Sequence, residues 1–147
     1  MKKILIFKTD RIGDFVYFAP CLKIIKNRFK ENCQITVVCG EYNYQIVKNY
    51  KIINKIICLK NGYIRDLLKL IKSTKKEKYD YLFQFDGLNK SFFSSLLINS
   101  ITKSAIFYKK KFNFLNFKLT RTRPNLFVRS FFNYSIICDQ DYNIKNK

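Results

Sequence analysis

Two short polar segments carry the residues whose types and spacing could do chemistry. Residues 9–14 follow an apolar run and end in Gly13 and Asp14, and residues 86–90 follow a second apolar run and end in Lys90. A carboxylate such as Asp14 can take a proton from a hydroxyl group. A lysine beside free backbone N–H groups at a helix start can bind an anion. Each segment also has an ordinary structural interpretation, since aspartate caps helices and an Asp-Gly pair forms turns.

The elements that must position these segments alternate between strands and helices. Apolar runs predict strands at residues 3–8, 34–39, 52–59, 79–85 and 104–108, and helical spacing predicts helices at residues 14–29, 42–50, 64–75, 89–100 and from Pro124 onward. Pro20 lies inside the first helical pattern, where it either kinks the helix or marks its first turn. The basic residues 109–123 are expected to form an irregular loop.

This alternation predicts an α/β fold, a Rossmann-like parallel sheet with helices on both faces. Ligands of such sheets bind beyond the carboxyl ends of the strands, so both polar segments are expected at the same edge. We expect a single domain over residues 1–138, followed by a polar tail over residues 139–147.

Several classes of site are disfavoured by what the sequence lacks. Neither the glycine-rich dinucleotide fingerprint nor a P-loop occurs, so no nucleotide is expected on this part. The chain has no histidine and no C-x-x-C pair, so no metal site is expected, and its five cysteines fit free thiols in a reducing cytoplasm. The apolar run after Met-Lys-Lys is too short for a signal peptide, and no stretch approaches the roughly 20 apolar residues of a membrane span. We therefore expect a cytoplasmic protein, at most peripheral at a membrane.

The formal net charge of +19 has two interpretations. One is an anionic partner such as nucleic acid, lipid headgroups or a phosphorylated substrate. The other is the coding bias of an AT-rich genome, which makes lysine the default surface residue. No Asp or Glu occurs between Gly87 and Cys138, where Lys and Arg accumulate, and such a stretch is a candidate anion-facing surface.

Residues 4–20 resemble the opening of glycosyltransferase family 9, the ADP-heptose:lipopolysaccharide heptosyltransferases. In that family an apolar strand leads into Gly-Asp and then into a hydrophobic helix with a proline about six residues on, and Gly13, Asp14 and Pro20 fit this pattern in type and spacing. The resemblance continues at residues 34–40, at Tyr-Asp of residues 79–80, at Gln-Phe-Asp-Gly-Leu-Asn-Lys-Ser of residues 84–91 and at residues 106–108. It covers about residues 1–108, with fainter similarity beyond.

The resemblance implies the N-terminal, acceptor-side half of a GT-B fold, in which two Rossmann-like domains face each other across a cleft. It implies inverting, metal-free transfer from a nucleotide-sugar such as ADP-heptose to an anionic lipopolysaccharide-core acceptor, next to the inner face of the cytoplasmic membrane. Asp14 would be the general base. The residues that would bind the acceptor are Gly13, Arg11, Lys90, Arg121 and Arg123. No cofactor is implied beyond the nucleotide-sugar, which would bind the other domain.

Two features depart from the family pattern. Asp and Gln are exchanged at Gln84 and Asp86. The chain is also less than half as long as a whole family member, and the C-terminal donor-binding domain is absent. We therefore expect a truncated or split form that is inactive alone, or one that works with a separate donor-domain chain.

Two alternatives belong to other functional classes. A basic nucleic-acid-binding module would use the aromatic residues, 17% of the chain, to stack on bases. However, these residues fall at core spacing and no nucleic-acid motif occurs, so a nucleic-acid partner is not expected. A non-catalytic docking domain would share the fold and differ only in lacking activity.

Overall fold

The computed structural model describes the backbone except at residues 31, 61–62, 115–116, 124–125 and 140–147, and its description of side chains also leaves out residues 63, 109–126 and 139. The elements are β1 (Lys2–Lys8), α1 (Ile12–Phe29), β2 (Cys33–Gly40), α2 (Glu41–Val47), β3 (Lys55–Leu59), α3 (Tyr63–Thr74), β4 (Tyr79–Gln84), α4 (Asn89–Leu96), β5 (Ser100–Phe114), β6 (Phe117–Arg123), α5 (Leu126–Arg129) and β7 (Tyr134–Asp139).

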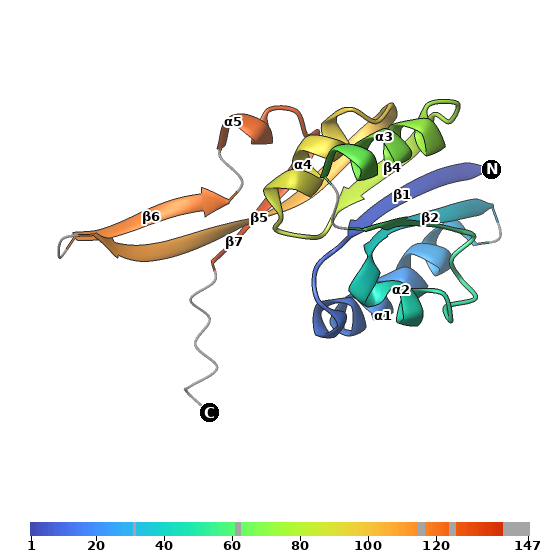
Figure 1. The fold of residues 1–147 in the computed structure, drawn as a ribbon, viewed down its shortest axis with the longest axis horizontal. Helices are drawn as coiled ribbons and strands as arrows, with labels where there is room; N and C mark the ends of the chain where they lie inside the picture. The colour runs from blue at the N-terminus through green and yellow to red at the C-terminus, as the bar shows by residue number, and fades with distance from the viewer. Residues whose placement is uncertain (31, 61–62, 115–116, 124–125, 140–147) are drawn as a thin grey trace.

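Within the described residues, seven strands form one sheet in the order β3-β2-β1-β4-β5-β6, and β7 pairs with β5 (Figure 1). All neighbours run parallel except β5 and β6, which are antiparallel. The four helices α1 to α4 each connect two parallel strands. This confirms the expected Rossmann-like fold class.

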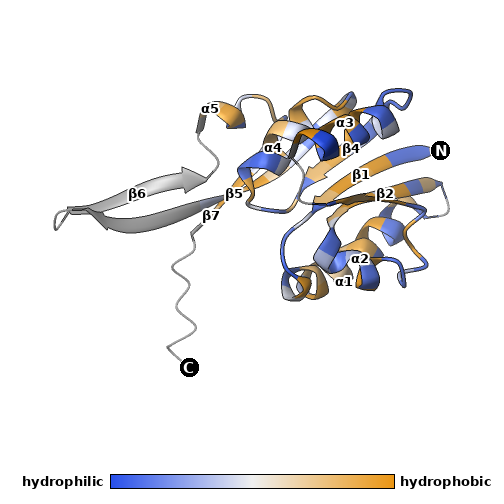
Figure 2. Cartoon of the chain, viewed as in Figure 1, coloured by the Kyte–Doolittle hydropathy of each residue, from blue (hydrophilic) through white to orange (hydrophobic). Residues whose placement is uncertain are grey.

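Strand β1 lies at the centre of the sheet and is buried on both faces. Its residues Ile4, Leu5, Ile6 and Phe7 have no solvent-exposed surface. A continuous apolar run is what such a two-sided position requires, and each side chain contributes roughly 1.5–3 kcal/mol of burial free energy. In Figure 2 the middles of β1 and β2 are accordingly hydrophobic, while the outer turns of the helices are mixed.

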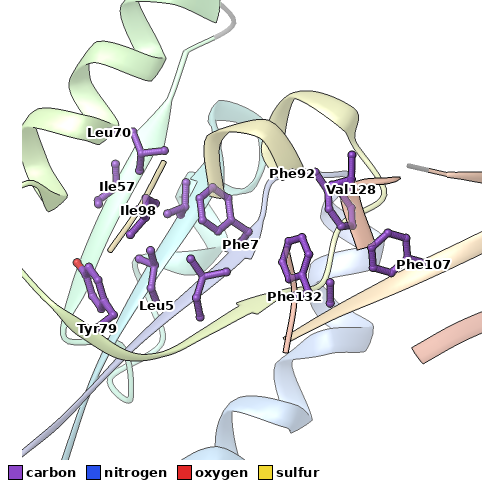
Figure 3. Close-up of a cluster of buried hydrophobic side chains, with 13 residues drawn as sticks. Leu5, Phe7, Ile57, Leu70, Tyr79, Phe92, Ile98, Phe107, Val128 and Phe132 are labelled. Atoms are coloured by element: carbon purple, nitrogen blue, oxygen red, sulfur yellow. The ribbon is translucent and has the colours of Figure 1, made fainter. Parts of the chain in front are cut away.

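Two hydrophobic cores lie on the two faces of the sheet. On one face, α1 and α2 pack on alternate residues of β1 and β2, with Phe15 and Leu22 fully buried. On the other, α3, α4 and α5 cover a cluster around Phe7, Phe92 and Phe107 (Figure 3). Phe132 joins this cluster, with ring-centroid distances of 5.6 Å to Phe92 and 6.0 Å to Phe107. The two layers hold β1 rigidly, so the loop after it starts from a fixed point.

Helix α1 begins at Ile12 and has Pro20 in its interior. The alternative in which Pro20 marks the first turn is therefore wrong. The N-cap residue is Arg11, and no side chain caps this helix end by a hydrogen bond. Asp14 is the third helical residue, so the ordinary interpretation of Asp14 as the N-cap is wrong as well.

The structure departs from the expected elements after residue 108. Residues 109–123 were expected to be an irregular loop, but they continue β5 and form β6, a hairpin that extends away from the other elements (Figure 1). The basic residues hid a period-two pattern in which Phe112 pairs with Leu119 and Phe114 with Phe117. The helix expected from Pro124 is only α5, because the β-branched run within Tyr134–Asp139 forms β7 instead.

Among the described residues, no helix combines the length and apolarity needed to cross a membrane. The five cysteines are free thiols, of which Cys33 and Cys39 are buried.

Candidate functional site

The largest hollow that we describe is a cavity of about 680 Å³ at the carboxyl ends of the strands. Its walls come from the loops after β1 and β4, from the ends of β2 and β3, and from parts of α1 to α4. The chain order reverses between β1 and β4, because β2 and β3 lie on one side of β1 and β4 and β5 on the other. Such a switch point opens a crevice between the two loops, and this is where ligands of open α/β sheets bind.

Four of the predicted site residues line this one cavity: Arg11, Gly13, Asp14 and Lys90. They come from two segments that are distant in the sequence, because Asp14 and Lys90 are 76 positions apart. The two polar segments that the sequence predicted at one edge of the sheet therefore do meet there. Arg121 and Arg123 lie in β6, and their side chains are outside the described part of the chain.

Asp14 is exposed in the first turn of α1 and makes no hydrogen bond or ion pair with another described residue. The positive end of the helix dipole favours a carboxylate there. Its oxygens are thus free to accept a proton or a hydrogen bond from a bound hydroxyl. An added Cβ at Gly13 would meet nothing within 4 Å, so the glycine leaves the space beside Asp14 open.

Behind the cavity wall lies the carboxylate of Asp86, which is fully buried and binds two residues of the wall, Thr9 and Leu88. Its Oδ2 accepts hydrogen bonds from the Thr9 backbone N–H at 3.1 Å and the Thr9 hydroxyl at 2.8 Å. Its Oδ1 accepts from Gln84 Nε2 at 2.8 Å and the Leu88 N–H at 3.2 Å. The Thr9 and Ser91 hydroxyl oxygens lie 2.9 Å apart. Burial raises the pKa of Asp86, and the Thr9 hydrogen bonds oppose that effect.

The loop after β1 is also held from the β2 side. The Asn43 amide donates to the Lys8 carbonyl at 3.1 Å. An added Cβ at Gly40 would lie 2.8 Å from the Thr9 carbonyl oxygen, so this close approach requires glycine. Lys8 is almost fully buried and donates to Asp10 Oδ2 at 2.7 Å. Burial raises the pKa of Asp10, and Lys8 acts in the opposite direction.

Carboxylates outnumber basic groups along the described cavity wall. Asp10, Glu41 and Asp66 join Asp14, so four of the ten acidic residues of a chain of net charge +19 are found here, against Arg11 and Lys90. The described wall of this cavity is therefore more acidic than the chain as a whole. Sequence reasoning missed Asp86, which was interpreted as a turn residue. The signal that could have identified Asp86 is its position just after a predicted strand, because the segment that ends in Asp14 also follows a strand.

Solved structures of glycosyltransferases share this fold. The glycosyl transferase family 9 from Veillonella parvula matches with a TM-score of 0.69 at 15% identity, over 92% of this chain and 36% of its own. E. coli heptosyltransferase WaaC with ADP matches with a TM-score of 0.70 at 18% identity, over 95% of this chain and 42% of its own. E. coli ADP-heptose lps heptosyltransferase II matches with a TM-score of 0.59 at 18% identity, over 72% of this chain and 30% of its own.

No protein-family model and no curated protein matches the sequence. The chain spans less than half the length of the solved structures that it matches. At these identities the likeness concerns the fold, which agrees with the strand order and layers described above. The chain therefore has the fold of one part, less than half, of a family 9 glycosyltransferase.

Proposed function

We propose that this chain is the acceptor-side domain of a family 9 glycosyltransferase and that Asp14 is its general base. The observation that carries the proposal is the cavity at the switch point of the sheet, which Asp14 lines together with Arg11 and Lys90. Among the described residues Asp14 is exposed and has no partner. The fold shared with heptosyltransferases supports a sugar-transfer reaction for a carboxylate in this place.

In the proposed reaction, the Asp14 carboxylate accepts the proton of an acceptor hydroxyl. The acceptor oxygen then attacks the anomeric carbon of the nucleotide-sugar. The bond from that carbon to the diphosphate breaks, the nucleoside diphosphate leaves with the electron pair, and the anomeric configuration inverts. A base must lie within hydrogen-bond reach of the proton that it takes, and the exposure of Asp14 on the cavity wall supports this role, because a hydroxyl bound in the cavity could approach it.

The donor is proposed to bind on a part of the enzyme outside residues 1–147. Holding donor and acceptor together supplies a large share of the rate enhancement in such reactions. The purified chain alone is therefore expected to give no transfer. The family likeness suggests ADP-heptose as the donor and a lipopolysaccharide-core sugar as the acceptor, and we propose these as the first substrates to test.

Different groups on the cavity wall can bind different parts of such an acceptor. A sugar hydroxyl donates a hydrogen bond, which Asp14 can accept, while Arg11 and Lys90 can bind a carboxylate or phosphate of the core. The net charge of +19 would favour contact with the anionic surface of the cytoplasmic membrane, where we propose that the acceptor is presented.

The test is to replace Asp14 in the enzyme assembled from this chain and its donor-binding part. Transfer of heptose from ADP-heptose to a heptose-free core oligosaccharide is followed by mass spectrometry. Asp14→Asn should lower the rate by roughly 10²–10⁴-fold, the usual contribution of a general base. Glu41→Gln is the matched control, because Glu41 is an exposed carboxylate on the same cavity wall. Retained activity in Asp14→Asn, or an equal loss in both variants, would remove Asp14 from the role of base.

A further inference from the structure

Asp86 connects the two loops that carry the proposed site residues. Each of its two carboxylate oxygens serves a different loop, because Oδ2 binds Thr9 after β1 whereas Oδ1 binds Leu88 after β4. Thr9 begins the segment that leads to Asp14, and Leu88 lies two residues before Lys90. A single buried side chain therefore links the segment of the candidate base to that of the candidate anion-binding lysine.

The backbone ladder between the two strands does not supply this link by itself. The residue pairs of β1 and β4 end at Phe7 and Gln84, and one further backbone bond joins the Phe85 N–H to the Phe7 carbonyl at 3.1 Å. Beyond that point the strands diverge into their loops. The described links beyond it are made by side chains: the Asp86 carboxylate, the Thr9–Ser91 hydroxyl contact, and the Lys8 ammonium group, which donates to the Phe85 carbonyl at 3.2 Å.

The exchange of Asp and Gln noted in the sequence has a simple consequence in this geometry. Gln84 and Asp86 are neighbours on the same side of the chain, and their side chains are hydrogen-bonded to each other at 2.8 Å. In this chain the carboxylate is the member of the pair at position 86, and it is the one that also reaches Thr9.

We propose that Asp86 is the positioning residue of this cavity, and that its carboxylate sets the spacing of the β1–α1 and β4–α4 loops that acceptor binding needs. The part of this inference that concerns the acceptor rests on the proposed function, and the part that concerns the loops does not. Asp86 is fully buried, so it acts on a ligand through Thr9, Leu88 and their loops and not by contact.

Asp80 provides a matched control at the opposite end of β4. It too is a carboxylate that accepts a hydrogen bond from a β1 backbone N–H, that of Lys3 at 2.8 Å. It lies at the amino edge of the sheet, away from the cavity. A change that acts only through general stability should be reproduced by altering Asp80, and a change in loop spacing should not.

The first measurement is amide hydrogen exchange by NMR on the chain carrying Asp86→Ala or Asp80→Ala. Asp86→Ala should raise exchange at Thr9 and Leu88 by about tenfold, as expected when an amide loses its hydrogen bond, and leave Lys3 unchanged. Asp80→Ala should do the reverse. If Asp86→Ala does not fold, Asp86→Asn keeps the shape and should raise exchange at one of the two loops. Unchanged exchange at both Thr9 and Leu88, or an equal rise throughout the chain, would overturn the positioning role.

The second measurement is the affinity of the same variants for a heptose-free, deacylated core oligosaccharide. We expect Asp86→Ala to bind about tenfold more weakly, since each loop loses a fixed contact, while Asp80→Ala binds as the unaltered chain does. Altered loop exchange with unaltered affinity would refute the acceptor part. If the unaltered chain does not bind this probe, the proposed acceptor is wrong, and so is the part of the inference that concerns the acceptor. The hydrogen-exchange measurements still test the part that concerns the loops.

Discussion

At the amino ends of the strands, Glu77 and Asp80 pair with partly exposed lysines, whereas at the carboxyl ends Asp86 is buried among hydrogen-bond donors and Asp10 pairs with the buried Lys8. Glu77 accepts from Lys55 at 2.6 Å and from Lys3 at 3.2 Å. Asp80 accepts from Lys2 at 2.8 Å. These lysines lower the pKa of Glu77 and Asp80, whereas burial raises the pKa of Asp86 and Asp10.

The carboxylates of the two edges therefore differ in their energetic cost and in the role that their surroundings favour. Paired, partly exposed charges at the amino edge are cheap to form and contribute modestly to stability. Buried carboxylates cost desolvation free energy and persist only where surrounding donors offset it, as four hydrogen bonds do for Asp86. Perturbed pKa values beside a cavity are typical of functional sites, and the carboxyl edge has both.

The largest expected effect comes from blocking the close approach at the carboxyl edge. Gly40→Ala would place a Cβ 2.8 Å from the Thr9 carbonyl oxygen, so the backbone of one loop must move. We expect a loss of about 1–3 kcal/mol in unfolding free energy, measured by urea denaturation. Gly13→Ala is the control, because its Cβ meets nothing within 4 Å, and it should leave stability unchanged or slightly raised. Equal losses in both variants would show that the contact with Thr9 is unimportant.

A smaller effect separates the two edges by pH. The lowered pKa of Asp80 gives stability that is present above the ordinary value of 3.8 and is lost as the pH falls below it. The raised pKa of Asp86 works in the opposite direction, because its charged form costs stability above the folded-state pKa and that cost disappears as the pH falls towards 3.8. In urea midpoints measured from pH 7 to pH 3, the cost of Asp80→Asn should therefore shrink on acidification and that of Asp86→Asn should grow. Parallel trends would contradict the comparison.

The smallest effect concerns salt at the amino edge. Glu77→Gln removes the ion pairs to Lys3 and Lys55, which are about a third exposed. We expect it to lower the unfolding free energy by about 0.5 kcal/mol at low ionic strength. The loss should largely vanish at 1 M salt, where charges are screened within roughly 3 Å. A loss that persists in high salt would mean that Glu77 acts through packing or hydrogen bonding rather than charge.

Local patterns along the chain were sufficient for most of the fold. Alternating apolar runs predicted β1 to β4 and the four connecting helices to within a few residues, because burial on a sheet or helix face imposes a period that neighbours in sequence reveal. The same signals failed after residue 108, where basic residues obscured a hairpin and a β-branched run became β7.

The residue types of the site and the sheet edge on which they meet followed from the sequence itself, since strands of one direction bring their following loops together. Only the tertiary structure decided that Asp86 is buried and reaches Thr9, 77 positions away, and that carboxylates outnumber basic groups around the cavity. The physical reason is that the burial of apolar residues produces a periodic pattern among neighbours in the sequence. The partner of a polar group depends instead on which distant segments the packed layers bring within hydrogen-bond distance.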